Sequence, residues 1–193
     1  TAYEIYQCDW SSDVCSSDLF DALERGEVRL TTPMMVSSRA AAQAPSKLGV
    51  RPGKSITVDQ AIDAIVTKSA NDVAVVISEK LGGTEERFAE KMTATAHKLG
   101  MAQTTFHNAS GLPDPLQLST ARDMAILGKR LIQDHPEYYP LFSRMDFSYA
   151  GQQIHTHNHL LENYEGADGI KTGYTVASGY NLVSSRSEEH TSE

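Results

Sequence analysis

Cysteine and tryptophan are almost absent from this chain, and the few that occur stand close together. Cys8, Trp10 and Cys15 all lie in the opening stretch "TAYEIYQCDWSSDVCSSDLF". The chain also lacks the roughly 18 consecutive apolar residues of a transmembrane helix and the basic-then-apolar order of a signal peptide. We therefore expect either a cytoplasmic protein or one whose targeting segment is missing. Positive charge is scattered singly against a net charge of -8, which excludes a nucleic-acid partner.

The remaining composition is that of an ordinary globular domain, with 193 residues of which 40% are hydrophobic. Thr57 and Gln60 have the spacing of a capping box, which predicts a helix start. Apolar periodicity and glycine stops predict helices, and alternation after residue 144 predicts strands. The helices are expected over 57–69, 70–83, 84–100 and 119–135, with a helix end at 20–26, and the strands over 145–161, 169–175 and 179–185. This order predicts an α+β or α/β fold.

The stretch "TKSAND" is the first that carries chemistry. Ser69 and Asn71 lie two residues apart at the junction of two predicted helices, so a hydroxyl and a carboxamide can face one cleft. The alternative is structural, because serine is a leading N-cap residue and Ser69 could merely cap the helix that begins at Ala70.

The second stretch is "DGIKTGYT", predicted to be a strand. Lys171 offers a positive charge, Thr172 a hydroxyl, and Gly173 a backbone without a side chain. An extended substrate could therefore pair with the edge of this strand. The alternative is an exposed strand that ends at a turn.

An S-x-N triplet followed by K-T-G occurs in penicillin-binding proteins and class A β-lactamases. Together with "TTFHNASGLPD", "STARDMAILGKRL" and "GADGIKTGYTVASGYNLVSS", the chain resembles the D-alanyl-D-alanine carboxypeptidases, the low-molecular-mass penicillin-binding proteins. The resemblance covers residues 20–185. It implies a β-lactamase/transpeptidase-like fold, with a helical subdomain and here an incomplete antiparallel sheet.

The resemblance also implies a function, a serine peptidase of the bacterial periplasm that trims the terminal D-alanine from peptidoglycan pentapeptides through an acyl-enzyme. Ser69 would relay a proton to the leaving amine, and Asn71 would hold the substrate amide. Lys171 and Thr172 would bind the terminal carboxylate, Gly173 would belong to the same substrate-binding strand, and the N–H of Tyr174 would form half of the oxyanion hole. β-Lactams would inhibit the intact enzyme, no metal or cofactor is implied, and a membrane anchor is possible in the full-length protein.

The chain departs from the family at the nucleophile. No lysine has a serine three positions before it, so the S-x-x-K motif is absent, and we expect the chain as given to be inactive. In relatives this motif precedes the text matching "FDALERGEV", a place that the opening stretch occupies here.

Three interpretations of the opening stretch compete: a disulfide segment, a two-cysteine metal site, or non-native sequence. "DWSSDVCSSDL" and, at the other end, "RSEEHTSE" resemble translations of a common sequencing-library adapter. We therefore expect residues 1–19 and 186–193 to be adapter-derived and loosely attached, and residues 20–185 to be a partial catalytic domain.

Two other functions are considered. A β-lactamase would need a general-base glutamate, but no E-x-x-x-N stretch lies between Asn71 and Lys171. A non-catalytic peptidoglycan-binding or scaffold protein is the other. His155, His157 and His159 alternate and could share one face as zinc ligands. We favour instead a row of solvent-facing side chains on a strand.

Overall fold

The computed structural model of the chain describes residues 4–6, 11–176 and 179–187, and it mixes helices with short antiparallel strands. The helical elements are α1 (Ser11–Glu24), α2 (Ser38–Ala41), α3 (Val58–Lys68), α4 (Asn71–Gly82), α5 (Glu85–Leu99), α6 (Ala121–Asp134), the 3-10 helix η1 (Tyr139–Ser143) and α7 (Leu160–Asn163). The expected α+β class is confirmed.

The strands of the described residues form antiparallel pairs and no larger sheet. They are β1 (Glu4–Tyr6) with β4 (Leu118–Thr120), β2 (Pro33–Met35) with β3 (Ser55–Thr57), β5 (Asp146–Tyr149) with β6 (Gln152–His155), and β7 (Ala167–Thr175) with β8 (Gly179–Arg186). The longest pair, β7–β8, is the incomplete antiparallel sheet that the resemblance implied.

Local sequence signals set the helix ends as predicted. The Thr57 and Gln60 capping box is formed in both directions at the start of α3. Thr84 caps α5 by accepting a hydrogen bond from the Arg87 N–H, and α5 ends at Gly100 with a φ of 99°. Such a left-handed cap position favours glycine, because in any other residue the Cβ atom would crowd the neighbouring backbone carbonyl.

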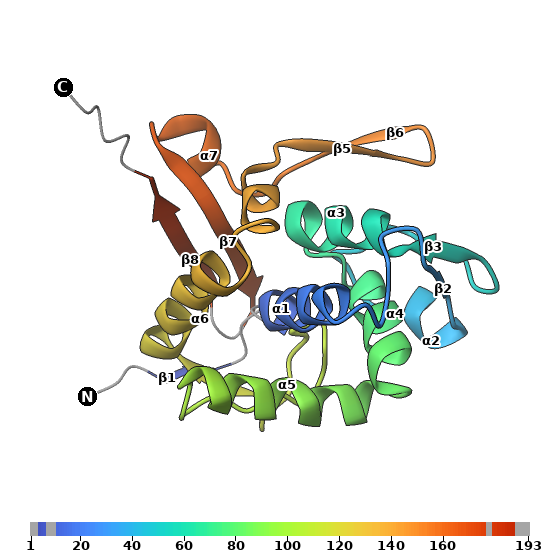
Figure 1. Cartoon of the computed structure of the whole chain (residues 1–193), viewed down its shortest axis with the longest axis horizontal. Coiled ribbons are helices and arrows are strands. Elements are labelled where there is room, and N and C mark those ends of the chain that lie inside the picture. Colours follow the sequence, from blue (N-terminus) through green and yellow to red (C-terminus); the bar gives the residue numbers. More distant parts are fainter. Residues whose placement is uncertain (1–3, 7–10, 177–178, 188–193) are drawn as a thin grey trace.

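Helix α1 is the centre of the packing, with α3 above it, α4 to its right, α5 below and α6 to its left in the view of Figure 1. Val14, Leu19 and Phe20 are buried in the core. The Phe20 ring stacks on Tyr138 with 4.7 Å between the ring centroids. The helix therefore joins the helical part of the molecule to the segment that leads into β5–β8.

The expectation that residues 1–19 are loosely attached is wrong for residues 11–19. All of them are buried in α1. The side chains of Val14, Leu19 and Phe20 pack in the core, so the polar residues of the same helix are buried with them. Cys15 is buried as a free thiol whose pKa is raised by burial. Cys8, Trp10 and residues 188–193 lie outside the described residues, while Arg186 ends β8.

The first half of α1 buries polar side chains whose hydrogen-bonding atoms are only partly satisfied. Asp18 is 1% exposed, and its Oδ1 accepts a hydrogen bond of 3.0 Å from the Thr95 hydroxyl. The Lys91 ammonium lies 3.7 Å from the same oxygen, whereas Oδ2 has no hydrogen-bond partner among the residues that the structure describes. Burial raises the pKa of Asp18, and Lys91 and Thr95 only partly offset this rise. The Oγ of Ser11 is likewise buried without a hydrogen-bond partner within residues 4–6, 11–176 and 179–187.

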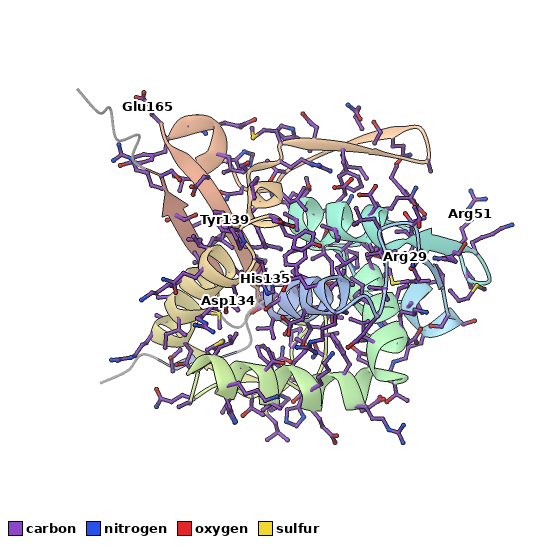
Figure 2. The ribbon with its side chains drawn as sticks, viewed as in Figure 1. Arg29, Arg51, Asp134, His135, Tyr139 and Glu165 are labelled. Carbon is purple, nitrogen blue, oxygen red and sulfur yellow. The ribbon has the colours of Figure 1, made fainter. Side chains whose placement is uncertain are left out.

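The end of α1 is tied to the end of α6 through a histidine. His135 is buried, and its Nδ1 hydrogen-bonds with Glu24 at 2.8 Å while its Nε2 lies 3.3 Å from the Ser17 hydroxyl. Figure 2 shows His135 where the C-terminal end of α6 meets α1. Asp21, Glu24 and His135 form the one compact group of possible metal ligands among the described residues. Both ring nitrogens of His135 have partners on α1, so this residue connects the end of α6 to α1.

The β7–β8 pair packs against α6 at a glycine. A Cβ on Gly128 would lie 2.6 Å from Cδ1 of Ile170 and 3.4 Å from Cγ1 of Val183. The missing side chain therefore lets the sheet approach the helix closely. No helix among the described residues combines the length and apolar character that crossing a membrane requires.

Candidate active site

Ser69 occupies the junction between α3 and α4 in a strained conformation. Its φ of 53° and ψ of 48° are left-handed, which costs a non-glycine residue about 1–3 kcal/mol and is frequent at functional sites. The structural alternative for Ser69 is wrong, because Ala70 is the N-cap of α4 and that helix has no side-chain cap. The Ser69 Oγ is instead buried with no hydrogen-bond partner among the described residues.

Asn71, in the first turn of α4, holds the loop that precedes α3. Its backbone N–H donates to the Ser46 carbonyl at 2.8 Å, and its Nδ2 donates to the Ala44 carbonyl at 3.0 Å. The Ser46 hydroxyl in turn donates to the Lys68 carbonyl at 3.1 Å. These bonds fix the loop at residues 44–46 beside the Ser69 junction.

Asp72 fixes the rest of that loop and was missed by sequence reasoning. The side chain is fully buried, and its Oδ1 accepts from the N–H groups of Leu48 and Val73 at 2.9 and 3.0 Å. Its Oδ2 accepts from the N–H groups of Gly49 and Val50 at 2.7 and 3.1 Å. The only signal was an acidic residue in the first turn after S-x-N, which is common on helices for electrostatic reasons alone.

Lys171 lies in the middle of β7, and the expectation of an exposed strand lysine is wrong. Only 4% of the residue is exposed, and no carboxylate of a described residue forms an ion pair with it. Thr172 is half-buried, Gly173 is buried and Tyr174 is 55% exposed. The Tyr174 ring lies 4.5 Å from that of Tyr180 on β8, between centroids.

These predicted residues meet in one place. A groove of about 1200 Å³ is lined by Ser69 and Asn71 from the helix junction and by Thr172, Gly173 and Tyr174 from β7. A small pocket that shares Ser69 and Thr172 with the groove adds Lys171. The groove exceeds the roughly 300–1,000 Å³ of most small-molecule pockets and suits an extended ligand.

Other walls of the groove come from loops that the sequence did not identify as site residues. Gly111, Leu112 and Pro113 form one wall. Asn108 shapes this turn, because its Oδ1 accepts from the Gly111 N–H at 2.7 Å and its Nδ2 donates to the Leu112 carbonyl at 2.8 Å. The Asn and Gly in "HNASGLPD" were the available signal for such a turn.

The histidine row does not form one cluster. His155 hydrogen-bonds with Asp146 through Nδ1 and with Glu162 through Nε2, both at 2.8 Å. His159 lies 3.5 Å from the other oxygen of Glu162. His157 instead lines both the groove and the small pocket. His155 and His159 therefore share Glu162, whereas His157 lies apart at the groove. Only His155 belongs to a strand, because β6 ends there, so the expectation of a row on one strand is wrong for His157 and His159.

Comparison with models of known protein families shows which family the chain belongs to. The family model described as D-alanyl-D-alanine carboxypeptidase, peptidase S11, matches residues 17–192. The chain belongs to this family. The match also includes residues 17–19 and 186–192, so the adapter-derived origin of the two ends stays a prediction.

Curated relatives agree with this assignment. D-alanyl-D-alanine carboxypeptidase DacC of Escherichia coli K12 is 35% identical over 174 residues, which cover 86% of this chain and 44% of the relative. DacA of the same organism is 36% identical over 144 residues, covering 74% of this chain and 36% of the relative. The chain thus spans less than half the length of these relatives.

Solved structures confirm the fold. Penicillin-binding protein 5 of Haemophilus influenzae superposes with a TM-score of 0.93 at 30% identity, covering 97% of this chain and 56% of that one. Penicillin-binding protein D2 of Listeria monocytogenes, in its ampicillin-bound form, gives 0.81 at 27% identity, covering 97% and 76%. The β-lactamase/transpeptidase-like fold is therefore the fold of this chain.

Proposed function

We propose that this chain is part of a serine-type D-alanyl-D-alanine carboxypeptidase and holds the substrate-binding half of its active site. The observation that carries the proposal is the buried ammonium of Lys171, which has no ion pair with a described residue and shares a pocket with the Ser69 hydroxyl. A buried cation is unfavourable unless an anion accompanies it. The free carboxylate of a stem peptide would supply that anion.

The strand β7 would hold the end of the substrate. Lys171 and the Thr172 hydroxyl would bind the terminal carboxylate, because a charge-assisted hydrogen bond in a partly desolvated site is stronger than a neutral one. Gly173 would let the peptide backbone approach the strand edge closely. The exposed Tyr174 and Tyr180 rings extend the same groove wall.

The Ser69–Asn71 junction would serve the departing D-alanine. The Ser69 hydroxyl can relay a proton toward the leaving amine, since it can both donate and accept a hydrogen bond. Asn71 would hold the substrate amide through its side chain. The backbone N–H of Tyr174 would form half of the oxyanion hole around the carbonyl under attack.

The nucleophile of this reaction is missing, because the sequence has no S-x-x-K motif. We propose that residues 1–19 and 186–193 are adapter-derived and replace native sequence. The burial of Ser11, Ser12, Asp13, Ser16, Ser17 and Asp18 in α1 supports this proposal, because a selected core helix rarely buries a polar run of this kind. The chain as given would bind a stem peptide without cleaving it.

The intact enzyme would act outside the cytoplasm, in the periplasm, on the pentapeptides of peptidoglycan. β-Lactams would inhibit it by acylating the nucleophilic serine in place of the peptide. Penicillin-binding protein D2 of Listeria monocytogenes has been solved in an ampicillin-bound and a cefotaxime-bound form, which supports the same class of inhibitor.

Peptide binding tests the proposal in the chain as it is. We would titrate it with Nα,Nε-diacetyl-L-lysyl-D-alanyl-D-alanine by NMR and compare the C-terminal amide of the same peptide. Lys171→Met should weaken binding of the free acid about tenfold or more, which corresponds to one lost charge-assisted hydrogen bond. Lys129→Met, an exposed lysine on α6 that lines neither the groove nor the pocket, is the matched control.

Stability measurements separate a binding defect from a folding defect. Lys171→Met removes a buried charge without an ion pair, so the variant should melt at the parent temperature or above it. Equal binding of the acid and the amide, or unchanged binding by a folded Lys171→Met variant, would contradict the proposed site.

A further inference from the structure

His157 is held at the groove by the residues on either side of it. Thr156 and Asn158 are buried, and the Asn158 N–H donates to the Thr156 hydroxyl at 3.1 Å. The Asn158 Oδ1 accepts from the Leu160 N–H at 3.2 Å, and the Thr156 N–H donates to the Met145 carbonyl at 2.8 Å. Successive side chains of an extended segment point to opposite sides. Since Thr156 and Asn158 point inward, His157 between them faces the groove.

The small pocket beside His157 is rich in hydrogen-bond donors. Its volume of about 10 Å³ has room for about one water-sized group. The Oγ of Ser69, the Oγ1 of Thr67 and the Nδ2 of Asn158 are buried there with no hydrogen-bond partner in the described part of the chain, and Lys171 adds a cation. No aspartate or glutamate lines this pocket or the groove. The chemistry of these walls favours an anionic ligand.

The charges around His157 are positive as well. Its pKa is lowered by desolvation first, then by Lys171 on β7, Lys68 on α3 and His159 in its own segment. These surroundings therefore disfavour the protonated form of His157. A carboxylate placed between the imidazole and Lys171 would reverse this effect, because a nearby negative charge favours the protonated ring.

We propose that His157 is a second binding group for the terminal carboxylate of the substrate, beside Lys171, and that it makes the affinity for this carboxylate rise as the pH falls. This inference rests on the proposed function, which supplies the carboxylate. It adds a histidine outside the S-x-N and K-T-G motifs and a pH dependence that the lysine alone would not give.

The direction of the pH effect follows from proton linkage. Binding raises the pKa of His157, so the complex takes up a proton in the range between its free and bound pKa values. Affinity then rises as the pH falls through the bound pKa and levels off below the free one. One proton taken up gives a slope of at most about tenfold per pH unit. The peptide carboxylate, with a pKa of about 3.5, stays ionised at pH 5 and above.

The experiment measures the dissociation constant of Nα,Nε-diacetyl-L-lysyl-D-alanyl-D-alanine from pH 5 to pH 8. For the unmodified chain we expect tighter binding toward low pH. His157→Asn should lose this slope while keeping the binding that Lys171 provides. His155→Asn is the matched control, because it removes a histidine of the same row that lines neither the pocket nor the groove. This control should keep the slope.

The outcomes separate this inference from the function on which it rests. If the peptide binds, Lys171→Met weakens binding, and His157→Asn keeps the parent slope, the inference about His157 is overturned and the proposed function stands. If the unmodified chain does not bind the peptide at any pH, both are overturned.

The ring of His157 gives an independent measurement that needs no variant of the site. NMR titration of its carbon and nitrogen shifts should show a higher midpoint with the peptide than without it. The C-terminal amide of the peptide should leave the midpoint unchanged. An equal midpoint with and without bound free acid would overturn the inference, even if affinity depends on pH through another group such as His159.

Discussion

Replacing Asp72 with asparagine should both destabilise the fold and release one wall of the groove. The native carboxylate accepts four backbone N–H groups, two on each oxygen, and three of them belong to Leu48, Gly49 and Val50. An asparagine keeps one acceptor oxygen and places an NH2 group where the other stood. Two backbone donors would then face another donor.

The magnitude can be worked from these four bonds. A hydrogen bond to a charged group contributes about 1.5–3 kcal/mol, and a neutral one about 0.5–1.5 kcal/mol. In the variant two of these hydrogen bonds would be lost and two would be weakened. Because Gly49 is exposed, water can accept a hydrogen bond from its N–H and reduce the loss. We therefore expect Asp72→Asn to lower the free energy of unfolding by about 3 kcal/mol, which is the low end for two lost hydrogen bonds to a charged group.

Thermal unfolding by circular dichroism and amide hydrogen exchange together test this estimate. In a domain of this size the loss corresponds to a fall in Tm of about 6–12 °C. Exchange at Leu48, Gly49 and Val50 should accelerate more than exchange in α5. The control Asp59→Asn removes an exposed carboxylate from the first turn of α3 and should cost at most about 1 kcal/mol. An unchanged Tm with unchanged exchange at these three amides would refute the reasoning.

Two further stability predictions concern packing away from the groove. Asp18→Asn should raise the Tm at pH 7 by about 2–4 °C, or about 1 kcal/mol, because it removes a buried charge and keeps the acceptor for Thr95. The pKa of Asp18 is raised in the folded protein. The free energy of unfolding of the parent protein therefore falls as the pH rises from the unfolded-state pKa of about 3.9 to the folded-state pKa, and the stability difference between Asp18→Asn and the parent should grow over the same window. An equal difference at all pH values would contradict this. Gly82→Ala should lower stability by about 2 kcal/mol, since its Cβ would lie 2.7 Å from the Phe88 Cβ and 2.9 Å from the Phe88 backbone nitrogen; a Tm at or above the parent value would show that α5 can move aside.

Elements with local signals were predictable from the sequence. The capping box at Thr57 and the stop at Gly100 placed α3 and α5 correctly, because caps depend on neighbouring residues. The strands expected over 145–161 are confirmed for β5 and β6, but β6 already ends at His155 and residues 160–161 begin α7. The helix expected to start at Ser119 has its N-cap at Thr120 instead. Two adjacent hydroxyl residues compete for that role, so the sequence could not choose between them.

Long-range features were not predictable in the same way. The polar stretch 11–19 has no helical apolar face, yet it is buried because Val14, Leu19 and Phe20 pack at the centre of the core. The burial of Lys171 depends on elements far from it in sequence. Asp72 accepts hydrogen bonds from Gly49 and Val50, which lie 23 and 22 residues earlier in the sequence, and no local pattern records such a contact.

The candidate site was predicted from two short motifs, and the structure places them along one groove. The motifs could not show that the Ser69 backbone is left-handed, because serine rarely adopts that conformation without a tertiary constraint. They also gave no reason to separate His157 from His155 and His159. That difference arises from Glu162 and Asp146, which engage two of the three histidines.

The central claim is that the chain retains the substrate-binding half of the active site and lacks the nucleophile. The most direct test is the intact mass of the denatured protein after incubation with a fluorescent penicillin. A chimera in which residues 1–19 are replaced by the corresponding S-x-x-K segment of the Escherichia coli DacC relative is measured beside it, after its folding is verified by circular dichroism. The account predicts no adduct on the chain as given and one penicillin per molecule on the chimera. An adduct on any serine of the chain, or none on a folded chimera, would contradict it.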